Sequence, residues 1–83
     1  MSSGKIRPLK LDLKNVGRRI REIRGFDLTQ AQFAEMLGVR QNTLSNYEKG
    51  KIVPTLEMLL KLKAHSGKSI DWIIIGEEKL SGQ

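Results

Sequence analysis

The stretch from Thr29 to Gly50, TQAQFAEMLGVRQNTLSNYEKG, constrains the fold of this chain more than any other segment. Thr29 followed three residues later by Gln32 forms a capping box, in which each side chain bonds a free backbone N–H at a helix start. Gly38 predicts the end of that helix, because glycine adopts the left-handed conformation without a steric clash. A second helix, residues 41–49, then ends at Gly50. The stretch therefore predicts two short helices joined by a tight turn.

Apolar residues at helical spacing predict a buried face on each of these two helices. Phe33, Ala34 and Leu37 lie on one side of the first helix. Leu44 and Tyr47 recur three residues apart on the second. Two such short helices can meet at a steep angle only where a small side chain lies at the crossing, and we expect Ala34 to be that residue.

A further helix is predicted before this stretch, beginning at Lys14 or Asn15 and ending at about Arg24. Apolar residues at helical spacing give it an inner stripe, and we expect arginines on its outer face. The stripe comprises Val16, Ile20 and Ile23, and the outer arginines are Arg18, Arg19 and Arg21.

Two more helices are predicted after Gly50. Thr55 caps the first, which ends near Ser66, and Ser69 caps the second, residues 70–75, which Gly76 ends. The domain is therefore predicted to span residues 14–76, with a polar tail at residues 77–83. The earlier of these helices is marked by Leu56, Leu59, Leu60 and the Lys63–Ala64 pair.

Residues 1–13 are predicted to form an extended basic arm. Leu9, Leu11 and Leu13 alternate with charged residues, which is the period of a strand, and Pro8 disfavours a central position in a sheet. The arm could lie across the domain, pair with a second copy or reach DNA, and the sequence does not choose between these.

The excess positive charge lies entirely at the start of the chain. Residues 1–24 carry eight basic and two acidic residues, 8 − 2 = +6, whereas residues 25–83 carry seven of each. Such a segment attracts a polyanion such as DNA, or it only keeps a small protein in solution.

Composition argues against several other classes of protein. The 83 residues are enough for one small domain. There is no cysteine and only one histidine, His65, so we expect no disulfide framework and no metal site. No apolar run approaches the ~18 residues of a membrane span. We find no paired-carboxylate pocket or phosphate-binding glycine loop, and therefore expect no catalysis and no cofactor.

The spacing of the central stretch resembles that of a known family. Counted from Gln30, an alanine is fifth, a glycine ninth and Leu44 fifteenth. With its flanks GRRIREIR, YEKGKxxPxxExLLKL and SIDWII, the stretch resembles the helix-turn-helix of the Cro and repressor family of phage and bacterial transcription factors. The resemblance covers roughly residues 14–76. It implies an all-α, compact five-helix bundle of the lambda-repressor-like DNA-binding type, preceded by an extended N-terminal arm.

In function, the resemblance implies a cytoplasmic regulator, encoded by a bacterium or a phage, that binds double-stranded DNA sequence-specifically. We expect a repressor that occupies an operator. The alternative is an antitoxin, whose main partner is a toxin protein, or the controller of a restriction–modification system, since either can use the same domain.

The outer face of the second motif helix is expected to read bases. A helix fits the major groove of B-DNA, where amide and hydroxyl side chains can meet the donors and acceptors of base edges. Asparagine and serine are poor helix formers, so their concentration here favours binding over an ordinary solvated face. The predicted readers are Gln41, Asn42, Ser45 and Asn46.

Other residues are expected to contact phosphate or to position the helix. Gln30, which bonds a phosphate by resemblance, stands at a helix N-terminus, where free N–H groups favour an anion. Lys49, Lys51 and the backbone amides after Gly50 would bind the strand on the other side of the groove, although the lysines could also remain solvated. Arg40 replaces a capping serine or threonine and would meet a phosphate, a guanine or solvent. Thr43 is assigned to the same positioning group.

By resemblance, Arg24 pairs with Glu48 and holds the first helix against the recognition helix. Such a pair contributes less than ~1 kcal/mol to stability where it is exposed, so its expected role is orientation.

The last helix is expected to form a dimer interface. Ile70, Ile73 and Ile74 can face the domain, which leaves Trp72 and Ile75 partly exposed. Exposed apolar surface of this kind marks an interface, unless Leu9 and Leu11 of the arm fold back to cover it. A twofold dimer would place two recognition helices roughly 34 Å apart on a near-palindromic operator.

Overall fold

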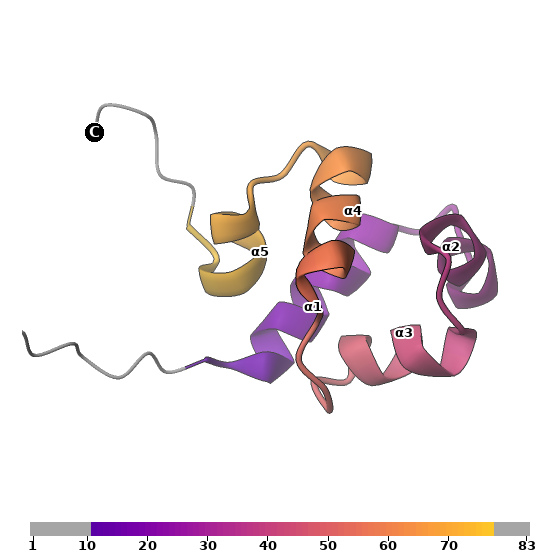
Figure 1. Cartoon of the computed structure of the whole chain (residues 1–83), viewed down its shortest axis with the longest axis horizontal. Coiled ribbons are helices and arrows are strands. Elements are labelled where there is room, and N and C mark those ends of the chain that lie inside the picture. The colour runs from indigo at the N-terminus through magenta and orange to yellow at the C-terminus, as the bar shows by residue number, and fades with distance from the viewer. Residues whose placement is uncertain (1–10, 78–83) are drawn as a thin grey trace, which may run out of the picture.

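The computed structural model describes residues 11–77 of the chain, which contain five helices (Figure 1). In that part there is no strand, and the prediction of an all-α, five-helix domain is confirmed. The predicted arm, apart from its last three residues, and the predicted tail beyond Glu77 lie outside the described residues. The helices are α1 Leu13–Arg24, α2 Gln30–Leu37, α3 Gln41–Glu48, α4 Leu56–Ser66 and α5 Ile70–Ile75.

α1 begins at Leu13, one residue before the earliest predicted start. The carboxylate of Asp12 accepts the backbone N–H of Asn15 at 3.3 Å and its side-chain amide at 2.7 Å. An aspartate in this position satisfies a backbone donor that has no partner within the helix. The end of the predicted arm is therefore the cap and first residue of α1.

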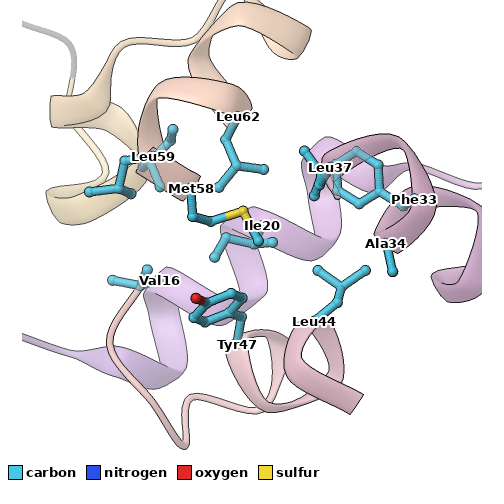
Figure 2. Packing of buried hydrophobic residues seen from close by; sticks show 11 residues of the cluster. Val16, Ile20, Phe33, Ala34, Leu37, Leu44, Tyr47, Met58, Leu59 and Leu62 are labelled. Atoms are coloured by element: carbon cyan, nitrogen blue, oxygen red, sulfur yellow. The ribbon is translucent and has the colours of Figure 1, made fainter. Parts of the chain in front are cut away.

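The core lies around α1, which contacts α3, α4 and α5 and runs through the middle of the molecule (Figure 1). Figure 2 shows side chains of α1, α3 and α4 pointing toward one another around Ile20, while α2 closes the cluster beside Leu44. The buried apolar residues are Val16, Ile20, Phe33, Ala34, Leu37, Leu44, Tyr47, Met58, Leu59, Leu62 and Ile73.

Besides the crossing of α2 and α3, where Ala34 is predicted to lie, α1 and α3 approach each other closely at a glycine. Ala34 is buried as expected. A Cβ atom added to Gly17 of α1, however, would lie 2.5 Å from the carbonyl oxygen of Tyr47 and nearer still to that of Glu48. The backbones of α1 and α3 therefore touch at Gly17, and no larger residue fits there without a shift.

Arg19 does not lie on the outer face of α1, and that prediction is wrong. Its side chain is buried, with Nε donating to the carbonyl oxygen of Ile73 at 2.9 Å and Nη2 to that of Ile74 at 3.0 Å. The last carbonyl groups of a helix have no partner within it. Because α5 ends against α1, the guanidinium satisfies two of them and fastens the last helix to the first.

The inner face of α4 also differs from the leucines that marked it. Met58, Leu59 and Leu62 are buried, whereas Leu56 and Leu60 are 68% and 51% exposed. The helix carries more large apolar residues than one face can hold, so burial is decided by which face meets α1, α2 and α5.

Candidate nucleic-acid interface

The ends of α2 have the geometry that the capping box predicts. The backbone N–H of Gln32 donates to Thr29 Oγ1 at 3.1 Å, and the Gln32 side chain accepts from the backbone N–H of Thr29 at 2.9 Å. Gly38 takes the left-handed conformation, with φ at 73°, and ends the helix. The side chain of Lys61 in α4 donates to the Leu37 carbonyl at 2.7 Å and steadies this turn, a contact that sequence reasoning missed.

α3 divides into a buried face and a polar face. Leu44 and Tyr47 point into the core (Figure 2). On the other side, Gln41 and Asn42 are exposed, and three further polar residues are half-buried. Their side chains form no hydrogen bond to any residue that the structure describes, so their donors and acceptors remain available. The half-buried residues are Thr43, Ser45 and Asn46.

The start of α3 has no side-chain cap. Arg40 occupies the N-cap position with extended backbone angles, and its side chain makes no capping hydrogen bond, as its sequence predicts. The side chain is exposed. Among residues 11–77 the guanidinium of Arg40 has no hydrogen-bond partner, so the start of α3 depends on its buried residues and the preceding turn.

The end of α3 is held by a cluster of three side chains, which we call the Glu48 cluster: Arg24, Gln30 and Glu48. Arg24 donates to both carboxylate oxygens, from Nε at 2.8 Å and from Nη2 at 3.0 Å, and Gln30 Nε2 donates to Oε1 at 3.0 Å. Only 4% of the Glu48 side chain and 18% of Arg24 is exposed. The hydrogen bond with Glu48 raises the pKa of Arg24 above its ordinary value, against the opposing effect of burial.

The segment after α3 that is expected to contact phosphate combines exposed lysines with a backbone amide that is already bonded within the chain. Lys49 and Lys51 have exposed side chains. The backbone N–H of Lys51, in contrast, donates to the Asn46 carbonyl at 2.9 Å and is not free to bind a phosphate. The chain turns back on itself here through Gly50, whose φ is 74°, so an internal bond replaces the expected external one.

The residues expected at a dimer interface lie at the end of the molecule opposite α2 (Figure 1). Ile73 is buried, and Ile70 and Ile74 pack against the core. Trp72 is half-buried, with the ammonium of Lys68 4.8 Å from its ring centre, and Ile75 is 43% exposed. Four other exposed apolar residues follow α3 in the loop and on α4: Ile52, Val53, Leu56 and Leu60.

Neither a metal centre nor a membrane span is found among residues 11–77. That part of the chain holds no group of three or more histidine, cysteine, aspartate or glutamate side chains that could bind a metal ion. None of its helices is both long and apolar enough to cross a bilayer.

The fold and the polar face of α3 define a helix-turn-helix domain of the Cro/repressor type. The helix-turn-helix family model matches residues 18–73 of the chain. Two uncharacterised HTH-type transcriptional regulators of Archaeoglobus fulgidus are 39% and 36% identical to it over 64 and 67 residues. These alignments cover 75% and 78% of this chain, and 90% and 96% of the two relatives. The chain belongs to this family of helix-turn-helix transcriptional regulators.

Two solved structures are similar to this one. The P22 c2 repressor protein in complex with synthetic operator 9T is 32% identical, with a TM-score of 0.68 over 75% of this chain and 96% of the repressor chain. The restriction–modification controller protein C.AhdI of Aeromonas hydrophila is 26% identical, with a TM-score of 0.64 over 74% and 94% of the two chains. These similarities confirm the lambda-repressor-like fold that the sequence resemblance implied.

Proposed function

We propose that this regulator is a repressor that binds a near-palindromic operator in double-stranded DNA as a homodimer. The observation that carries the proposal is the polar face of α3, whose side chains have unused hydrogen-bond donors and acceptors. The opposite face of this helix is packed into the core, and its last residue is held by the Glu48 cluster. The similar P22 c2 repressor was crystallised on a synthetic operator, which supports double-stranded DNA as the ligand. The binding function needs no cofactor and no reaction, and we place the protein in the cytoplasm.

In this proposal α3 enters the major groove and its polar face meets the base edges. Glutamine and asparagine can form two hydrogen bonds with adenine, and serine can donate or accept. Phosphate contacts on either side fix the position of the helix without reading sequence. The base readers are Gln41, Asn42, Ser45 and Asn46, and the positioning residues are Gln30, Arg40, Thr43, Lys49 and Lys51.

Selection of bound duplexes from a random pool tests sequence-specific binding directly. We expect one enriched motif with two inverted half-sites whose centres are about one helical turn apart. A pool that shows no enrichment after several rounds, with folded protein, would refute sequence-specific binding. A motif with a single half-site would still support base readout by α3, but it would refute binding as a dimer.

The dimer is supported by apolar surface that the single domain leaves uncovered. Such surface lies at Ile75 and on α4 around Leu60. Leu60→Glu and Ile75→Glu place a charge on each surface in turn, and both positions are exposed, so the fold should survive. Whichever of the two substitutions lies at the dimer interface should shift the protein toward monomer in sedimentation. It should also weaken binding to the whole operator far more than binding to an isolated half-site. If wild-type protein sediments as a monomer with and without operator, the dimer is wrong.

A second candidate is the controller of a restriction–modification system, favoured by the similarity to C.AhdI. An antitoxin is the related possibility. These candidates share the DNA-binding surface and differ in the genes they serve. Restriction and modification genes beside this one would indicate the controller, and a protein that copurifies with the chain from its own cells would indicate the antitoxin.

A further inference from the structure

Gln30 makes a contact that a simple phosphate-binding role does not need. Its side-chain nitrogen donates to Glu48 Oε1 at 3.0 Å, and the same oxygen accepts from Arg24 Nη2 at 3.0 Å. Arg24 also donates from Nη1 to the Leu28 carbonyl at 3.2 Å. The Glu48 cluster therefore joins the end of α1, the loop after it, the first residue of α2 and the last residue of α3.

The bond to Glu48 leaves Gln30 able to bind a phosphate as well. A side-chain amide nitrogen carries two hydrogens, and Glu48 uses one of them. The backbone N–H groups of Gln30 and Ala31 at the start of α2 have no partner among the described residues. A phosphate at this helix end would therefore lie one side chain away from the buried carboxylate of Glu48.

The two ends of α3 are held very differently. Glu48, at its last residue, accepts three hydrogen bonds, whereas Arg40 provides no cap at its start. The seven residue steps from Glu48 back to Gln41 extend about 10 Å along the helix. A small rotation at the Glu48 cluster is therefore magnified at Gln41 and Asn42, two of the proposed base readers.

We propose that Gln30 is a positioning residue for base readout, which links the phosphate contact at α2 to the orientation of α3 through Glu48. This inference rests on the proposed function. Loss of the Gln30 side chain then lowers discrimination between operator and other DNA. Loss of a contact made to phosphate alone lowers both affinities by the same factor.

The test compares Gln30→Met, which keeps the length of the side chain without its hydrogen bonds, with Lys51→Met as a matched control outside the Glu48 cluster. Affinity is measured for the selected operator and for an unrelated duplex of equal length. We expect Gln30→Met to reduce the ratio of the two affinities by roughly fivefold, the loss of about one hydrogen bond. We expect Lys51→Met to leave the ratio unchanged. A proportional loss of both affinities in Gln30→Met would overturn the inference.

A double-mutant cycle with Glu48→Gln gives a second, independent measurement. Far-ultraviolet circular dichroism first establishes that each variant is folded. If Gln30 acts through Glu48, the two changes are non-additive in the affinity ratio; additive effects would refute the coupling. A wild-type protein with no preference for any selected duplex would instead refute the proposed function, so the two failures are distinguishable.

Discussion

Replacing Gly17 by alanine should destabilise the protein, although alanine is the better helix former. Gly17 lies within α1, where glycine is less favourable than alanine by about 1 kcal/mol on intrinsic propensity. From the sequence alone, Gly17→Ala is thus a stabilising change. The structure predicts the opposite sign, because the added methyl group would meet the backbone of α3.

The size of the effect follows from the distances at this crossing. The new Cβ atom would lie 2.5 Å from the Tyr47 carbonyl oxygen and 2.8 Å from the Glu48 carbonyl carbon. An ordinary contact is about 3.5 Å, so the two helices must separate by roughly 1 Å. Overpacking costs ~1–3 kcal/mol, and the upper end applies because both groups are backbone. After subtraction of the propensity gain, a net loss of about 2 kcal/mol remains.

Thermal and urea unfolding followed by circular dichroism would measure this loss. For a domain of this size, about 2 kcal/mol corresponds to a decrease in Tm of roughly 8–16 °C. Ala64→Gly, at an exposed position in α4, is the matched control, since it reports the alanine–glycine propensity difference without a packing effect. If Gly17→Ala raised Tm by as much as Ala64→Gly lowered it, α1 and α3 would not touch as described.

Four other substitutions test the link between α1 and α5, the start of α3 and the proposed DNA contacts. Arg19→Met removes both hydrogen bonds to α5, so Trp72 fluorescence should report loosening of this helix at lower urea than the circular dichroism signal of the whole domain; coincident curves would contradict a separate role for Arg19. Arg40→Ser supplies the missing cap of α3 and should add about 1 kcal/mol of stability while it weakens DNA binding, whereas unchanged binding would leave Arg40 in solvent. Asn46→Ala should reduce the binding free energy by on the order of 1–3 kcal/mol at one operator base pair. Lys51→Ala should weaken binding to every sequence and flatten its salt dependence. If Asn46→Ala also weakened binding to all sequences equally, α3 would not read bases.

Sequence reasoning succeeded where a structure is set by residues close together in the chain. The capping box of Thr29 and Gln32, the left-handed Gly38 and the missing cap at Arg40 all depend on neighbours within four positions. Such interactions form in the same way wherever the segment lies in a fold. Four of the five helix starts and the helix-turn-helix itself were therefore predictable.

The errors occurred where a side chain meets a distant part of the chain. In the sequence nothing distinguishes Arg19 from the nearby Arg18 and Arg21. Its burial depends on the end of α5, where it bonds carbonyl groups of residues 54 and 55 positions away in the chain. Gly17 lies inside a helix where propensity favours alanine, so nothing near it in the sequence indicates its contact with α3. The bond between Gln30 and Glu48 had no signal of its own, since either residue is ordinary at its position.

These contacts also explain why α3 is helical at all. It has eight residues, no side-chain cap and several poor helix formers, so it would not be stable in isolation. It is stabilised on its inner face by the burial of Leu44 and Tyr47 and by the contact with Gly17. Its last residue is held by the Glu48 cluster. The outer face therefore contributes little to stability. Its residues are free to be those that suit base edges, which is why asparagine and serine can occupy a helix that their own propensities disfavour.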